Sequence, residues 1–288
     1  STRNQERPIY PWNKMPALDL YSAQMDDDGE MKDIVLFSDV INTDEHESSA
    51  TFSQDGNTIY FDRTNEDRVK NENDVRVAHI SIYRAEMVDG EWTNVEKLPF
   101  SSEDYSVEHP SLSADGTKLY FASDMPGESG SFDIYMVDIN EDGTFGTPQN
   151  LGAGVNTANR EQFPFISEND VLYFTSDGHQ GFGNLDIYRT EGDFSEVENL
   201  GSSINSGNDD FAYVVKESDE TGYFASNRRR TDNLYQFTRE ENEIVEAPTE
   251  VDPTSGQDLI PIDGSKNYFD FDKATIKKES EVVLLSPT

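Results

Sequence analysis

The sequence contains no cysteine, which excludes a disulfide framework and any metal site with thiolate ligands. It has no apolar run near the roughly 20 residues that a membrane-spanning helix needs. Basic residues are scarce: 22 Lys and Arg stand against 58 Asp and Glu, giving a formal net charge of −36. Such a surface repels phosphate backbones and anionic lipids, so we expect no nucleic-acid partner and no direct membrane-surface binding.

Large aromatic side chains are what the chain does contain. The hydrophobic fraction of the 288 residues is only 34%, but it includes 13 Tyr and 17 Phe. Flat rings pack well on pleated sheets, so their burial can support one large all-β domain or two ordinary ones. We therefore predict a folded β-protein under an acidic, solvated coat.

The aromatic residues recur in a repeat. Four segments run from a turn into a strand that ends in a Tyr-Phe pair, and a second strand of the form Asp-Ile-Tyr follows each one. The tyrosines of the Tyr-Phe pairs are Tyr60, Tyr120, Tyr173 and Tyr223. The tyrosines of the second strands are Tyr83, Tyr135, Tyr188 and Tyr235, with an earlier copy at Tyr21. Asp-Gly turns between these strands are typical of β-hairpins, because Gly accepts the positive φ of a tight reversal.

Each unit of roughly 50 residues carries about four short strands, which is the pattern of propeller blades. We predict an all-β propeller of five or six blades, with four complete repeats and a half blade in this chain. The Tyr-Phe and Asp-Ile-Tyr strands are expected to be the inner strands. Asp133, Asp186 and the four tyrosines of the Tyr-Phe pairs recur at fixed steps, so we expect structural hydrogen bonds from them rather than catalysis. An acidic residue stands before three units, and Val107 takes its place in the fourth; the acidic residues are Glu47, Glu161 and Asp209.

Two of the segments resemble a known repeat family. SDMPGESGSFDIY (123–135) and SDGHQGFGNLDIY (176–188) carry the Gly-rich turn before Asp-Ile-Tyr that marks PD40 (WD40-like, TolB-like) propeller repeats. The resemblance covers roughly residues 17–240, after an N-terminal extension of residues 1–16. It implies the propeller fold and leaves the function open, because such folds carry many functions.

A second resemblance lies near the C-terminus. NYFDFDKATIKKESEVVLL (267–285) is similar to the opening of an OmpA-like peptidoglycan-binding domain. This implies a truncated start of that domain at 267–288, because a typical domain continues for about 100 residues. No peptidoglycan-binding residue is therefore assigned in this chain. Residues 241–266, which are acidic and rich in Pro, are predicted to be a linker.

No catalytic motif stands out, and we predict that the protein is not an enzyme. It has no Gly-x-Ser-x-Gly elbow and no phosphate-binding glycine loop, and its four histidines lack metal-ligand spacing. The best metal candidate is the turn with Asp138, Asn140 and Asp142, which matches the start of a calcium loop. Its twelfth position is Gln149 rather than Glu, so a hairpin turn is preferred and calcium stays an alternative, with no other cofactor expected. The basic segment 227–230 is expected to be a solvated loop.

PD40 repeats followed by an OmpA-like domain resemble the PorE-like envelope proteins of Bacteroidota that are associated with type IX secretion and gliding motility. Those proteins also carry helical repeats and often a β-sandwich, which are not visible here, so this is a shorter member or a partial sequence. The resemblance implies a non-enzymatic scaffold in the periplasm, with outer-membrane barrel or secretion and motility components as partners and an anchor on peptidoglycan. A lipid anchor in the full-length protein is compatible with it. Two alternatives stay open: an enzyme that cleaves glycans or peptides at the central channel, and a calcium- or small-ligand-binding propeller.

Overall fold

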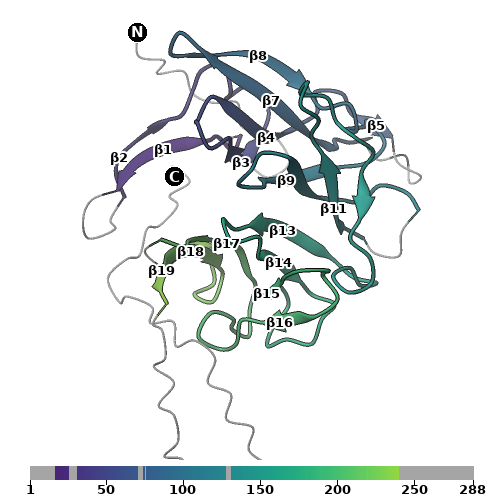
Figure 1. Cartoon of the computed structure of the whole chain (residues 1–288), viewed down its shortest axis with the longest axis vertical. Coiled ribbons are helices and arrows are strands. Elements are labelled where there is room, and N and C mark those ends of the chain that lie inside the picture. The colour runs from purple at the N-terminus through teal and green to yellow at the C-terminus, as the bar shows by residue number, and fades with distance from the viewer. Residues whose placement is uncertain are drawn as a thin grey trace, which may run out of the picture.

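A computed structural model describes residues 17–25, 31–70, 74, 76–127, 131–218 and 220–239. These residues form 19 strands and no helix, and the strands gather into small antiparallel sheets that fan around a common centre (Figure 1). None of the described residues belongs to a helix long and apolar enough to cross a membrane. The prediction of an all-β propeller is confirmed.

Four sheets are blades that match the four sequence repeats. The first consists of β3 (Glu47–Phe52), β4 (Thr58–Thr64), β7 (Ile80–Val88) and β8 (Glu91–Lys97). The second consists of β9 (Val107–Leu112), β10 (Lys118–Ser123), β11 (Asp133–Asp138) and β12 (Gln149–Asn150). The third consists of β13 (Glu161–Ile166), β14 (Leu172–Ser176), β15 (Asp186–Thr190) and β16 (Val197–Asn199). The fourth has three described strands, β17 (Asp210–Lys216), β18 (Thr221–Ser226) and β19 (Asn233–Thr238).

Two hairpins complete the described strands. The polar insertion after β4 folds back as β5 (Val69–Lys70) and β6 (Arg76–Val77). At the start of the chain, β1 (Tyr21–Met25) pairs with β2 (Met31–Leu36) as a two-stranded sheet, which we call the half blade. The described part of the chain thus holds four blades and a half blade. The predicted extension, linker and OmpA-like start, at 1–16, 241–266 and 267–288, lie outside the described residues.

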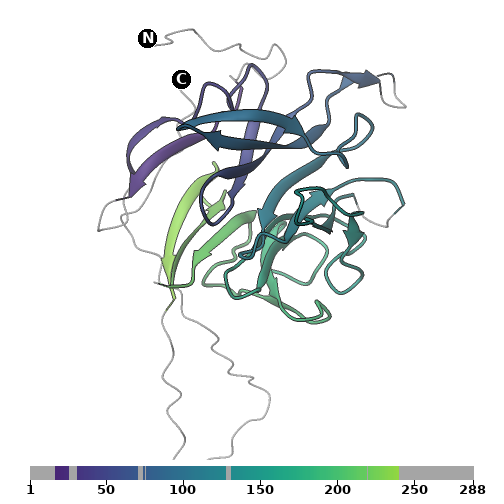
Figure 2. The same cartoon turned by 45° about the horizontal axis from the view of Figure 1, so that its top comes forward.

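The innermost strands are β3, β9, β13 and β17, which contact one another in that order around the axis (Figure 2). The Tyr-Phe and Asp-Ile-Tyr strands are the second and third strands of each blade, and they are the two inner strands of each four-stranded sheet, as expected. The strand before the turn lies nearest the axis and contacts the corresponding strand of the next blade. No described strand of the fourth blade contacts β1, β2 or β3, so the ring is open between them.

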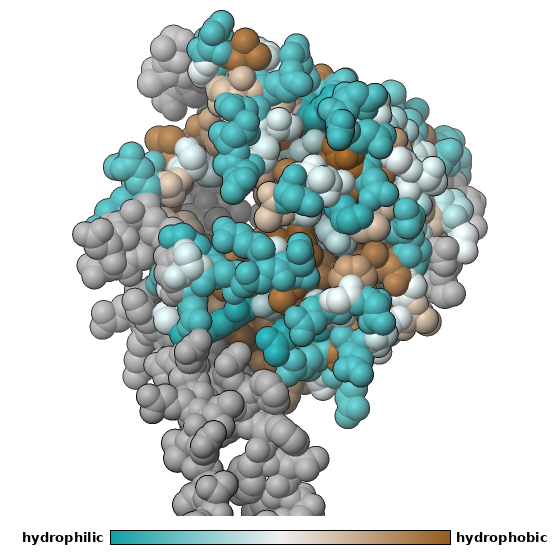
Figure 3. Space-filling model, viewed as in Figure 1, coloured by the Kyte–Doolittle hydropathy of each residue, from teal (hydrophilic) through white to brown (hydrophobic). Residues whose placement is uncertain are grey.

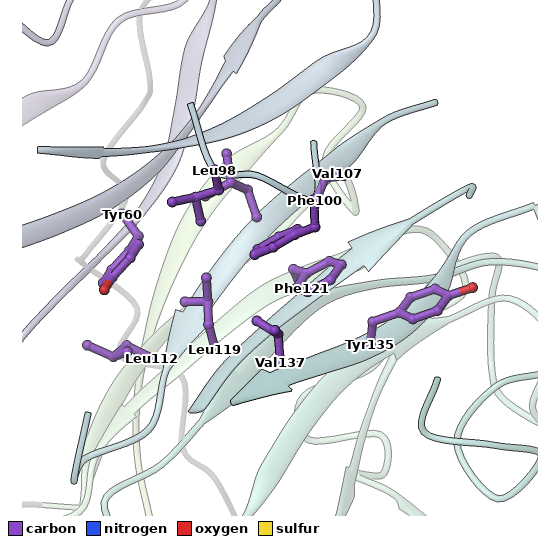
Figure 4. Close-up of a cluster of buried hydrophobic side chains, with 10 residues drawn as sticks. Tyr60, Leu98, Phe100, Val107, Leu112, Leu119, Phe121, Tyr135 and Val137 are labelled. Atoms are coloured by element: carbon purple, nitrogen blue, oxygen red, sulfur yellow. The ribbon is translucent and has the colours of Figure 1, made fainter. Parts of the chain in front are cut away.

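The core lies between successive blades rather than inside any one of them. Tyr60 and Ile82 of the first blade pack against Leu119, Phe121 and other residues of the second. Figure 4 shows Tyr60, Leu119 and Phe121 gathered in this cluster. Similar clusters join the second blade to the third and the third to the fourth. Hydrophilic residues cover most of the face seen in Figure 3, with apolar patches between them.

Candidate functional site

A buried acidic side chain stands at the start of three innermost strands. Glu47 is fully buried and accepts hydrogen bonds from the Oγ1 and backbone N–H of Thr43 at 2.6 and 3.0 Å. Glu161 repeats this geometry with Thr157 at 2.8 Å for both bonds. The third acidic side chain is Asp210, which accepts two hydrogen bonds from Ser206, rather than the predicted Asp209. The strand register is the reason, because Asp210 lies opposite Ser226 just as Glu161 lies opposite Ser176.

Cationic side chains cover two of these carboxylates and also stack on aromatic rings. Arg63 donates to Glu47 and lies 4.7 Å from the ring centre of Tyr83. Arg228 forms a buried ion pair with Asp210 and lies 5.0 Å from the ring centre of Phe224. The expectation that 227–230 is merely a solvated loop is therefore wrong for Arg228, whose side chain is only 17% exposed. The counter-charge offsets part of the cost of burying the carboxylates of Glu47 and Asp210.

The second blade replaces this ion pair with apolar packing. Val107 lies opposite Ser123 in the sheet and is fully buried, at the step where the other blades place an acidic residue. Phe100 stacks on Phe121 with ring centres 5.0 Å apart. The replacement of the acidic residue by Val107 is thus accompanied by an additional aromatic ring, that of Phe100.

Asp133 and Asp186 are buried at the start of the third strands. Asp133 accepts a hydrogen bond from the side-chain amide of Asn150 at 3.0 Å. Asp186 accepts from the backbone N–H groups of Phe182 and Gly183 at 2.7 and 3.0 Å, and burial raises the pKa of its carboxyl. Both side chains thus bind groups of their own blade.

The four repeated tyrosines lie on the second strands. Tyr60, Tyr120 and Tyr173 are buried in the three clusters between blades. The hydroxyl of Tyr173 accepts a hydrogen bond from Arg239, which also donates to the hydroxyl of Tyr213 at 3.0 Å. The hydroxyl of Tyr223, which is half-buried, lies 3.3 Å from the side-chain amide of Gln236.

The weak calcium candidate follows β11. Asp138 binds Lys118 at 2.7 Å, and Asn140 donates to the hydroxyl of Thr144 at 2.9 Å. Asp142 accepts from the same Thr144, so the three side chains hold their own hairpin turn. Within the described ranges, no group of three or more His, Cys, Asp or Glu side chains is arranged to hold a metal ion.

The described residues that most resemble a functional site are a group of polar side chains near the axis. We call this group the axial cluster; it consists of Ser48, Asp62, Glu108, His109 and Gln162. Asp62 is fully buried and accepts from the Ser48 hydroxyl at 2.6 Å and from the His109 backbone N–H at 3.0 Å. Glu108 is 5% exposed and accepts from the Gln162 side chain at 2.6 Å. The axial cluster therefore links the first three blades.

Irregular backbone places these side chains. The pairing of β9, β13 and β17 with the second strand of each blade shifts register at one point, as a β-bulge does. His109, Phe163 and Ala212 stand at these points with φ of 56°, 50° and 53°. The His109 ring consequently stacks on Phe163 with centroids 3.7 Å apart. Sequence analysis missed the axial cluster, and only the non-repeated Glu-His pair marks it in the sequence.

The electrostatics of the axial cluster follow from its burial. Burial raises the pKa of Asp62 to about 6. Burial first, and then the charge of Asp62, raise the pKa of Glu108 to about 8. Burial lowers the pKa of His109 to about 3, so its ring is neutral and its Nδ1 can accept the 3.4 Å hydrogen bond from the Phe163 N–H. Near neutral pH the carboxyl of Glu108 is therefore protonated. The neutral ring of His109 provides no positive charge to the axial cluster.

The half blade corresponds to the outer half of a blade. Asn42 accepts from the N–H of Leu20 at 2.8 Å and donates to its carbonyl at 2.9 Å. The same two bonds hold third strands in complete blades: Asn156 holds Ile134, and Asn205 holds Ile187. β1 therefore occupies the place of a third strand, and its only described partner is β2.

Apolar side chains of the half blade are exposed. Tyr21 is 58% exposed, whereas three of its four counterparts, Tyr135, Tyr188 and Tyr235, are 4%, 2% and 7% exposed. The fourth counterpart, Tyr83, is half-buried. Other exposed apolar side chains gather on or beside this hairpin: Leu18, Ile34, Val35, Leu36 and Val40. Contiguous apolar surface of this kind marks interaction sites.

Comparisons with known proteins find a likeness to the chain only among solved structures, at low sequence identity. No family model matches it, and no curated protein matches it. Among solved structures it is similar to TolB from Acinetobacter baumannii, with 16% identity, a TM-score of 0.49 and coverage of 73% of this chain and 44% of that one. The chain thus spans less than half the length of that TolB.

Other solved structures that are similar to the chain are of quite different proteins. One is a puromycin-hydrolyzing peptidase of Mycobacterium tuberculosis, with 13% identity, a TM-score of 0.44 and coverage of 67% of this chain and 30% of that one. Another is from a nidogen–laminin complex, with 13% identity, a TM-score of 0.47 and coverage of 77% and 71%. The function must therefore be argued from this chain's own residues.

Proposed function

We propose that this protein is a non-enzymatic, protein-binding scaffold of the bacterial cell envelope. The observation that carries the proposal is the half blade, where apolar side chains that complete blades bury are exposed to solvent. The rest of the propeller supports it as a rigid frame, because its repeated acidic and amide side chains are engaged in hydrogen bonds between and within blades. A rigid frame with exposed apolar side chains on β1 and β2 suits docking rather than turnover.

The finer part of the proposal comes from the sequence resemblance. The protein resides in the periplasm, its partners are an outer-membrane barrel or secretion and motility components of type IX kind, and an OmpA-like domain beginning at 267–288 links the assembly to peptidoglycan. The net charge of −36 favours partners with basic surfaces.

The test is affinity capture of the tagged full-length protein from its native envelope, followed by mass spectrometry. We expect an outer-membrane barrel or secretion component to co-purify, and Tyr21→Asp to reduce its recovery relative to Phe182→Asp, a control at an equally exposed aromatic residue. Recovery of peptidoglycan fragments alone, with no envelope protein, would refute the scaffold function.

A second candidate function is hydrolysis at the axis, because Asp62 and Glu108 place two carboxyls near one another there. Both side chains are buried and already bound to protein groups, which favours an architectural role. Turnover of glycan or peptide substrates that Glu108→Gln abolishes, with the fold intact, would establish the enzyme instead.

A further inference from the structure

Three buried polar atoms of the third blade have no hydrogen-bond partner among the described residues. They are Oδ1 of Asp186, the hydroxyl of Tyr188 and Nδ2 of Asn199. Asp186 and Tyr188 are only 1% and 2% exposed, so bulk solvent does not reach their polar atoms. A buried polar atom without a partner is costly, and three of them in one blade point to a bound molecule.

The three side chains share one face of the outer half of the blade. Asp186 and Tyr188 are two residues apart on β15, and Asn199 on β16 lies directly opposite Tyr188. A Cβ built on Gly181 would lie 1.9 Å from Oδ2 of Asp186 and 2.7 Å from the Tyr188 hydroxyl, so both side chains meet beneath that glycine. The amide of Asn199 faces the same hydroxyl without a hydrogen bond of regular geometry.

The second blade makes a direct bond at this place. Asn150, the counterpart of Asn199, donates to Oδ2 of Asp133 at 3.0 Å. The two asparagines are oriented alike, because Oδ1 of each accepts from the backbone N–H two residues further on, at 2.7 Å for Asn150 and 2.8 Å for Asn199. The difference between the blades therefore lies in the aspartate.

Loop 178–183 draws Asp186 away from Asn199. Oδ2 of Asp186 accepts from the N–H groups of Phe182 and Gly183 at 2.7 and 3.0 Å. The loop can approach the carboxylate this closely because Gly181 has no Cβ. Both loop donors use Oδ2, so Oδ1 of Asp186 and Nδ2 of Asn199 are left facing the same space.

The donors and acceptors around this space select its occupant. Asp186 provides an acceptor, Asn199 provides a donor, and the Tyr188 hydroxyl can act as either. The amide of Asn199 cannot turn over, because its Oδ1 also accepts from the side chain of Asn205 at 2.9 Å. An inward N–H disfavours a cation, and a carboxylate disfavours an anion. A neutral molecule that both donates and accepts fits, and the smallest such molecule is water.

We propose that one water molecule is an integral part of the third blade. It accepts a hydrogen bond from Nδ2 of Asn199, donates one to Oδ1 of Asp186 and forms a third with the hydroxyl of Tyr188. Three bonds are the usual number for a buried water. Through Asp186 the water joins loop 178–183 to the outer strand β16. This inference is independent of the proposed function.

The direct test is a crystal structure of the full-length chain at a resolution that shows ordered water. We expect a density peak at about 2.6–3.2 Å from all three atoms. A direct hydrogen bond between Asn199 and Asp186, or no peak between the three side chains, would overturn the proposal. So would a peak at about 2.4 Å from the oxygen atoms, which is the distance of a bound calcium ion.

Tyr188→Phe provides a second measurement, by thermal unfolding of the full-length chain. If the hydroxyl binds a water, its removal takes away one partner, and the melting temperature should fall by about 2–4 °C. If the hydroxyl has no partner, its removal relieves an unpaired buried group, and an unchanged or higher melting temperature would contradict the proposal.

Tyr83→Phe is the matched control. Tyr83 stands at the same step of the first blade, where Ser81 replaces the aspartate and Lys97 lies opposite the tyrosine. The first blade therefore lacks the acceptor and the donor of this site, and the variant should melt as the unchanged chain does. Equal falls in the two variants would show that the hydroxyl of Tyr188 has no special partner.

Discussion

Glu108→Gln is the substitution that tests the electrostatics of the axial cluster most directly. The glutamine side chain has the same shape and can still accept the hydrogen bond from Gln162, but it cannot ionise. In the folded chain the pKa of Glu108 is about 8, against an ordinary value of 4.5. Between pH 4.5 and 8 the folded state therefore binds more protons at this site than the unfolded chain does.

The sign and size of the effect follow by linkage. Stability falls as pH rises wherever the folded state holds the extra proton, so the contribution of Glu108 is fully present below pH 4.5 and is lost by about pH 8. At about 1.4 kcal/mol for each pKa unit, the loss is on the order of 5 kcal/mol. Asp62 adds a smaller loss between its ordinary pKa of 3.8 and about 6.

The assay is urea unfolding of both chains at pH 5, 7 and 9, followed by tryptophan fluorescence. The free energy of unfolding of Glu108→Gln should exceed that of the unchanged chain by a few kcal/mol at pH 9, and the two should approach each other at pH 5. Glu191→Gln, at an exposed position, serves as the control with no such pH dependence. Parallel stability curves for Glu108→Gln and the unchanged chain would refute the argument.

Three further predictions address the blades. Arg228→Ala leaves the buried carboxylate of Asp210 without its cation and should lower stability by roughly 3 kcal/mol in urea unfolding; an unchanged midpoint would show that the ion pair contributes nothing. Gly181→Ala places a methyl group 1.9 Å from a carboxylate oxygen of Asp186, so its melting temperature should fall by several degrees, while Gly207→Ala, in open space, melts as the unchanged chain does. Millimolar calcium should leave the melting temperature unchanged, because the acidic side chains of the turn after β11 bind protein groups; a rise of several degrees would favour the calcium-binding alternative.

The repeat is what made the blades predictable from the sequence. Hairpin turns and Tyr-Phe pairs are local features, and their period of roughly 50 residues fixed the blade boundaries. The sequence did not show which strand of a blade lies nearest the axis, because a β-strand whose two faces are both buried looks the same in sequence whether it is first or second in its sheet. Only contacts between blades, such as β3 with β9, separate these cases.

The axial cluster was not predictable from the sequence, because its residues do not recur in the repeat. Asp62 and Glu108 stand at steps where the other blades have unrelated residues, so a search for similarity passes over them. Their meeting depends on a bulge with left-handed backbone at His109, for which no glycine or asparagine gives a signal. Arg228 was predicted to be solvated because a charged side chain is usually exposed. Its partner Asp210 is 18 residues away in the sequence and adjacent in the sheet, so nothing in the sequence indicated the ion pair.

The open joint between the half blade and the fourth blade has a mechanical consequence. With contacts only between successive blades, the described ring is a linear series of units, and a force applied at its ends can peel the terminal unit without disturbing the next.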